Sequence, residues 1–387
     1  MDDTNYVLLG LLRRALFGQP FSMLKTEMDW TALYREARAH AVHLLLYDSL
    51  TQEERSSMPV TVEKQWRTCS LQTLQKNLIL LMEQERMIKV LNEESISCAV
   101  FKGSAIAANY PRPELRCSGD IDLWVKKTDL ISAKLLLEKA GYVERAKQCA
   151  WHLTMQREHF IIELHFAPAG IPNGKRGEGF YQYFQSIPQL DFSQQAVALL
   201  LHKLNHIRKD GLGLRHLCDW ALFVQKNLDE VTWRSLEPQL KAFGLLHFAK
   251  IITRICTEYL GLPKCSVLWC MDGDKTLTEA LLQDVLQTGN FGCKEARYGQ
   301  RLFTDGGAGG RLGSLWRTGI NACKTQWPAC QKTSVLIPLA PFVLMARRLK
   351  QKEALYLWDS FQKAKPRQTL YRSLKPFLED SSAENEL

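Results

Sequence analysis

The chain has 387 residues, 50 lysines and arginines against 41 aspartates and glutamates, and a formal net charge of +9. Its hydrophobic content of 46% is ordinary for a folded protein and argues against long-range disorder, while the length predicts two or three domains. The moderate positive charge favours anionic ligands such as phosphates. No basic run is interleaved with aromatic residues as in a nucleic-acid-binding module, so we do not predict one.

The eleven cysteines are scattered, and the closest pairs, Cys265/Cys270 and Cys323/Cys330, lack the C-x-x-C spacing of a metal site. We therefore expect reduced thiols in a cytoplasmic protein. The first residues lack the basic and apolar segments of a signal peptide. The longest nearly uncharged apolar run, 335–346, is shorter than the about 20 residues that span a bilayer, so no transmembrane segment is predicted.

Residues 1–95 are predicted to form an N-terminal helical region. Asp29 is a plausible N-cap for a helix that begins at Trp30. A long helix is expected over 62–92, because apolar residues recur there near the 3.6-residue period. These residues are Leu71, Leu74, Leu78, Leu81 and Ile88.

Residues 96–168 change period and predict a mixed α/β core. The expected elements are strands at 97–101, 120–125, 142–144, 150–156 and 159–166, with helices at 104–109 and 129–140. In 120–125 the alternation places Asp120, Asp122 and Trp124 on one face of the strand. The same alternation in 159–166 puts Glu163 and His165 on one face.

The rest of the chain is predicted to be helical. Residues 169–262 form a helical region with a hairpin of helices at 196–208 and 214–227, and 263–387 form a basic helical region. The glycine-rich run 305–314 lacks the G-K-S/T ending of a P-loop, so we interpret it as a loop. The fold expected from the whole pattern is α+β, with a small mixed sheet embedded between N-terminal helices and a C-terminal helical region.

The pair Asp120 and Asp122 is suited to holding divalent cations. Two carboxylates on one strand face lie about 6–7 Å apart, so both can bind one Mg²⁺ or Mn²⁺ beside phosphate oxygens. Glu163 is the candidate third acid, with Glu144 and Glu158 as alternatives. A lone Asp-x-Asp is common at strand ends. The order of strand, Gly-Ser, helix, Asp-x-Asp and a third acid on another strand is far more demanding.

The segment Lys102-Gly103-Ser104 lies between a predicted strand and a predicted helix. Glycine lets backbone amides approach phosphate oxygens, and the helix N-terminus favours their negative charge. Lys102 and Arg116 could neutralise a departing pyrophosphate. These four residues are the candidate nucleotide-binding set.

These motifs resemble the uncharacterised bacterial nucleotidyltransferase family of the DNA polymerase β-like superfamily. The resemblance rests on Lys102-Gly103-Ser104, Tyr110-Pro111, Arg116, Gly119-Asp120-Ile121-Asp122-Leu123 and Glu163-Leu164-His165, and covers about residues 5–230. It implies a five-stranded-type core, Mg²⁺ and a nucleoside triphosphate (NTP) donor. It also implies that Gly103 and Ser104 bind phosphates, that Asp120 and Asp122 bind metal, and that Glu163 is the third acid. The spacing from Gly-Ser to the first aspartate is longer than is usual in the superfamily.

The helical segment 211–220 also resembles this family. Arg215 and Asp219 are most simply an intrahelical ion pair. The resemblance prompts a second interpretation, in which they line an acceptor pocket together with His165. His202 and His206 are also four residues apart, but His-Lys-Leu-Asn-His lacks the glutamate of HExxH, so a metal site is not favoured there.

The sequence thus predicts a Mg²⁺-dependent nucleotidyltransferase that moves a nucleoside monophosphate from an NTP to an acceptor that the sequence does not identify. A rival hypothesis is a catalytically degenerate nucleotide-binding or interaction protein of the same fold. A third is polyanion binding through the basic helices expected at about 340–378.

Overall fold

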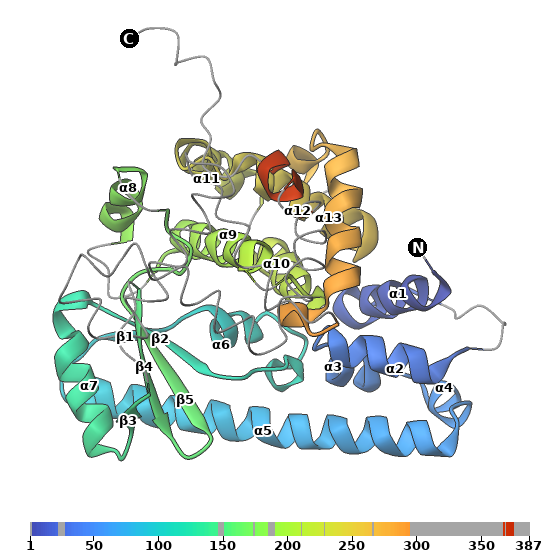
Figure 1. The fold of residues 1–387 in the computed structure, drawn as a ribbon, viewed down its shortest axis with the longest axis horizontal. Helices are drawn as coiled ribbons and strands as arrows, with labels where there is room; N and C mark the ends of the chain where they lie inside the picture. Colours follow the sequence, from blue (N-terminus) through green and yellow to red (C-terminus); the bar gives the residue numbers. More distant parts are fainter. Residues whose placement is uncertain are drawn as a thin grey trace, which may run out of the picture.

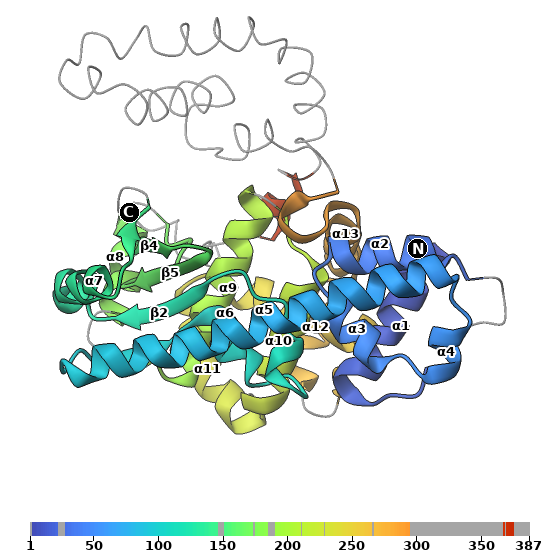
Figure 2. The same cartoon turned by 90° about the horizontal axis from the view of Figure 1, so that it is seen from below.

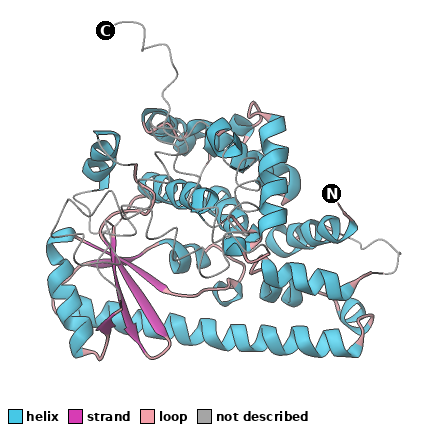
Figure 3. Cartoon of the chain, viewed as in Figure 1, coloured by secondary structure: helices cyan, strands magenta, loops and turns pink. Residues whose placement is uncertain are grey.

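The structure is a computed structural model that describes residues 2–21, 28–145, 151–172, 175–184, 190–209, 211–227, 229–264, 267–294, 367 and 369–374. The glycine-rich run 305–314 and almost all of the basic segment at 340–378 lie outside these residues. The described residues form an α+β fold, in which one small sheet is surrounded by helices (Figure 3). Within them, no helix combines the length and apolar character needed to cross a membrane.

Four short helices precede the long fifth helix, and side chains of the N-cap residues Asp2, Asp29 and Thr51 cap three of them. Asp29 accepts a hydrogen bond from the backbone N–H of Ala32, as predicted, and Thr51 forms a capping box with Glu54. The four helices are α1 (Asp3–Phe17), α2 (Trp30–Ala39), α3 (His43–Ser49) and α4 (Gln52–Ser56).

Helix α5 (Val60–Glu93) is a single rod of 34 residues that passes beneath both the N-terminal helices and the sheet (Figures 1 and 2). The existence of this helix is confirmed. The predicted apolar repeat is buried only in part, because Leu71 and Leu78 are exposed, whereas Leu74 and Ile88 pack against the core. The buried face includes Asn77 and Glu83. Because these two residues are polar, a search for hydrophobic periodicity does not assign them to the buried face.

The buried side chain of Asn77 in α5 is hydrogen-bonded through both its amide nitrogen and its carbonyl oxygen. Its side-chain amide donates hydrogen bonds to the backbone carbonyls of Glu114 and Arg116, at 2.7 and 2.8 Å, and its carbonyl accepts one from the N–H of Ser118. Buried polar groups need such partners. The helix therefore holds in place the loop that leads into the second strand.

The five-stranded sheet has the order β1-β2-β5-β4-β3. Its central pair, β2 and β5, is parallel, and the other pairs are antiparallel. The strands are β1 (Cys98–Val100), β2 (Ile121–Val125), β3 (Val143–Glu144), β4 (His152–Arg157) and β5 (Phe160–His165). All five were expected from the sequence, with bounds that differ by a few residues.

The alternation in β2 separates two hydrophobic clusters. Ile121, Leu123 and Val125 pack against the inner faces of α5 and α7 (Leu130–Lys139), whereas Trp124 packs into the larger helical core on the opposite side. The predicted division of the strand into two faces is confirmed. The acids of the strand therefore lie on the side of the sheet that faces the later helices.

The later helices cover that side of the sheet. Figure 1 shows α9 and α10 above the sheet, with α6 between the sheet and α10. The predicted hairpin over 196–227 is confirmed as α9 and α10. The helices are α6 (Lys102–Ala107), α8 (Lys175–Phe184), α9 (Phe192–Lys209), α10 (Leu214–Asn227), α11 (Glu230–Ala242), α12 (Leu246–Tyr259) and α13 (Lys275–Thr288).

Candidate functional site

Three carboxylates meet where β2 and β5 run side by side. The parallel register pairs Asp122 with Glu163, so their side chains leave the same face of the sheet. Asp120 immediately precedes β2, and one oxygen from each of the three carboxylates lies within 4.8 Å of the others. Such a group of oxygen donors fits the ligands that Mg²⁺ and Mn²⁺ take in proteins.

The two alternative third acids lie elsewhere. Glu144 is on the edge strand β3 and forms an ion pair with Lys134 at 2.8 Å. Glu158 is in the turn between β4 and β5, and its side chain is 76% exposed. Of the three candidates, Glu163 is the one that joins the two aspartates.

A lysine and a histidine contact the central aspartate. His165 Nε2 lies 2.8 Å from Oδ1 of Asp122 and 3.0 Å from Oε2 of Glu163, and the Lys102 ammonium lies 3.4 Å from the same Asp122 oxygen. The sequence interpretation placed His165 beside a possible acceptor pocket, and in the structure its ring contacts the two acids. Although burial raises the pKa of Asp122, Lys102 and His165 together hold it below its ordinary value.

Asp120 is in a different electrostatic environment from Asp122. Solvent reaches the residue, but the surrounding protein desolvates its carboxylate, and the charges of Asp122 and Glu163 repel its own charge. These effects raise the pKa of Asp120 to about 6. Neighbouring carboxylates with pKa values displaced in opposite directions are typical of functional sites.

The segment Lys102-Gly103-Ser104 forms the first turn of α6, two residues earlier than the predicted helix start. Lys102 has a φ of 45°, in the left-handed region that is strained for a residue with a side chain. A Cβ on Gly103 would lie 3.1 Å from Nη1 of Arg116, closer than nearly all real contacts. A side chain at position 103 would therefore require the Arg116 guanidinium to shift by a few tenths of an ångström.

Arg116 is held by a buried acid from α10. Its Nε and Nη2 each donate to a separate oxygen of Asp219 at 2.8 Å, and the Tyr110 hydroxyl donates to Asp219 at 2.8 Å. The predicted pair between Arg215 and Asp219 is therefore wrong, because tertiary packing supplies a better partner. Arg215 instead donates to the backbone carbonyl of Cys117 at 2.6 Å.

One cavity brings these groups together with residues that were not among those predicted for the site. Its lining includes Lys102, Gly103, Arg116, the three acids, Arg215 and Asp219. Further lining residues come from helices α9 and α10 and from the turn after α13. They are Leu199, His202, Lys203, His206, His216 and Phe291. Of the residues predicted for the site, Ser104 and His165 are not in this lining.

Lys203 is the most unusual of the added residues. Its side chain is 1% exposed, and its ammonium lies 5.6 Å from the centre of the Trp220 ring. Burial lowers the pKa of Lys203 to about 8, although Asp219 partly opposes this effect. No sequence signal marks this residue, because a lysine in an amphipathic helix is ordinarily exposed.

One comparison with known proteins identifies the family of this chain. No curated protein and no solved structure matches the chain. A family model described as an uncharacterised nucleotidyltransferase matches residues 26–261, which include the sheet, α6, α9 and α10. Because the match covers more than half of the 387 residues, the chain belongs to this uncharacterised nucleotidyltransferase family.

Proposed function

We propose that the protein transfers a nucleoside monophosphate from an NTP to an acceptor, with Mg²⁺ or Mn²⁺ held by Asp120, Asp122 and Glu163. The observation that carries the proposal is the group of three carboxylates within 4.8 Å on two parallel strands. Bound metal would neutralise phosphate charge and stabilise the charge that develops on the attacking and leaving oxygens. Family membership supports nucleotidyl transfer in general terms.

The residues around the carboxylates suit the donor. The backbone amides of Gly103 and Ser104, in the first turn of α6, would hold phosphate oxygens. Lys102 lies against Asp122 and could move onto the pyrophosphate once a cation takes its place. Arg116 is already balanced by Asp219, so we infer that it shapes the cavity beside Gly103 more than it supplies free charge.

The acceptor is inferred to enter from the helical side. Arg215 and Asp219 line the cavity from α10, and Lys203 lines it from α9. We also infer a relationship to the DNA polymerase β-like superfamily, which the small mixed sheet with acids on neighbouring strands supports. The described cysteines are free thiols, which supports the proposal of a cytoplasmic protein.

The proposal is tested with α-labelled ATP, and then with the other NTPs, in the presence of Mg²⁺ and cell extract as the source of acceptors. We expect label to appear in a product with the wild type, and to fall to background with Asp120→Asn, Asp122→Asn and Glu163→Gln. Glu158→Gln is the matched control, because this exposed acid lies outside the cavity. It should transfer label at the wild-type rate.

The degenerate nucleotide-binding alternative predicts a different result. Metal-dependent NTP binding would persist, but no NTP would give a labelled product. Equal transfer by the wild type and the three site variants would contradict the assignment of the carboxylates.

A further inference from the structure

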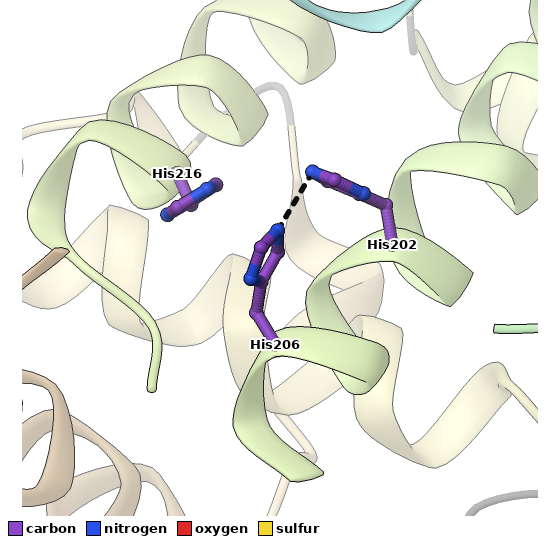
Figure 4. Close-up of side chains that lie close together, drawn as sticks. All are labelled: His202, His206 and His216. Carbon is purple, nitrogen blue, oxygen red and sulfur yellow. Dashed lines mark hydrogen bonds between the residues drawn. The ribbon is translucent and has the colours of Figure 1, made fainter. Parts of the chain in front are cut away.

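Three histidines meet at the helical side of the cavity. His202 and His206 project from α9, and His216 projects toward them from α10 (Figure 4). The Nε2 atoms of His202 and His206 are 3.0 Å apart, and the His216 ring centre lies 4.8 Å from that of His206. One nitrogen from each ring lies within 4.8 Å of the others. The sequence could not reveal this, because His216 is separated from the other two by a loop and a helix start.

The spacing is close to that of ligands on one metal ion. Two imidazole nitrogens on a tetrahedral Zn²⁺, each about 2.0–2.1 Å from it, lie about 3.3 Å apart. The observed 3.0 Å between His202 and His206 needs only a small adjustment to reach that value. Both residues lie on one face of α9, four positions apart, so the helix fixes their relative position.

Two of the three rings are in the chemical state that metals require. Burial, the neighbouring His206 and the nearby cations lower the pKa of His202 and of His216 well below 6.5, so these rings are neutral at physiological pH. Gly213 N–H donates to Nδ1 of His216 over 3.3 Å, a long hydrogen bond. Because this bond is weak, either nitrogen of His216 can present its lone pair at little cost.

We propose that His202, His206 and His216 form a binding site for a borderline transition-metal ion such as Zn²⁺, separate from the carboxylates in the same cavity. Neutral imidazoles select Zn²⁺ and similar ions, whereas carboxylates select Mg²⁺ and Mn²⁺. Three protein ligands leave one position open for water or a substrate atom. The site goes beyond the proposed nucleotidyl transfer, which needs no nitrogen ligands.

The simpler rival is a hydrogen bond between two neutral imidazoles, with no ion. Another group of nitrogen and oxygen donors, made by His152, Glu163 and His165, must also be distinguished. That group has two histidines and the proposed site has three, so the number of imidazoles bound to the ion distinguishes the two groups.

The test is a titration of untagged, metal-free protein with Co²⁺ in excess Mg²⁺, followed by visible absorption. We expect one equivalent of Co²⁺ to give the bands of a nitrogen-ligated ion, and one equivalent of Zn²⁺ to remove them. His202→Asn and His206→Asn should lose the bands, whereas the controls His152→Asn and Asp120→Asn should keep them. Absence of the bands in the wild type, their survival in the first two variants, or their loss in His152→Asn would overturn the proposal.

A second measurement needs no variant and so does not depend on the folding of one. Pulsed electron paramagnetic resonance of the wild type loaded with one equivalent of Cu²⁺ counts the imidazoles coupled to the metal. Three are expected, and two or fewer would overturn the site. Neither readout uses an NTP, so a failure of the metal-site proposal is distinguishable from a failure of the proposed nucleotidyl transfer.

Discussion

Removal of the Asp219 carboxylate should be among the most destabilising single changes in this protein. Asp219 accepts two hydrogen bonds of 2.8 Å from Arg116, and the two side chains are 5% and 6% exposed. Asp219→Ala leaves a buried guanidinium without its ion-pair partner, and it also removes the acceptor of the Tyr110 hydroxyl. Loss of one partner from a buried pair costs about 3–5 kcal/mol of unfolding free energy.

The measurement is the free energy of unfolding from urea denaturation at neutral pH. The matched control is Asp272→Ala, since Asp272 is 66% exposed and its ion pair with Lys250 should contribute less than about 1 kcal/mol. Removal of both charges in Arg116→Met/Asp219→Leu should cost less than the sum of the single changes, because no charge is then left unpaired. The reasoning is refuted if Asp219→Ala costs no more than Asp272→Ala, or if the double change is additive.

Three further predictions concern packing and pH. Burial lowers the pKa of His43 to about 4, so the neutral ring stabilises the fold fully above pH 6.5, and about 3 kcal/mol of unfolding free energy is lost as the pH falls to 4. His43→Asn should weaken the pH dependence of the unfolding free energy between pH 6.5 and 4. The control His159→Asn, at an exposed position, should leave that dependence unchanged. Gly213→Ala should lower the melting temperature, since a Cβ would lie 2.7 Å from a backbone Cα, whereas Gly179→Ala meets nothing within 4 Å and should leave it unchanged or slightly higher. Burial lowers the pKa of Lys203 to about 8, so the neutral amine contributes fully to the unfolding free energy above pH 10.5, and this contribution is lost as the pH falls toward 8. Lys203→Met should therefore raise the unfolding free energy by about 2–3 kcal/mol at pH 7, with a smaller gain at pH 10, and an equal gain at both pH values would contradict this.

The carboxylate site was predictable because it depends on local periodicity. Alternation within two strands places Asp120, Asp122 and Glu163 on polar faces, and parallel pairing of these strands brings the acids into register. The same reasoning predicted the α9–α10 hairpin.

The partners of Arg116 and the third histidine could not be predicted from local patterns. Arg116 meets Asp219 across 103 positions of sequence, so the intrahelical interpretation chose the nearer and wrong partner. His216 joins His202 and His206 only when α9 and α10 pack together. Asn77 and Glu83 illustrate a related failure, because polar groups satisfied by tertiary hydrogen bonds occupy a face that hydrophobicity would assign to solvent.

Helix α5 sets a limit on how this protein can be divided. At 1.5 Å per residue its 34 residues extend for about 50 Å. Val62 and Trp66 near its start belong to the helical core, whereas Met87 and Leu91 near its end belong to the cluster beneath the sheet. A fragment that begins at the first strand would lose the α5 side chains that complete the hydrophobic cluster beneath the sheet. The sheet is thus not an independent unit, and any chimaera or shortened protein built from it has to carry the second half of this helix.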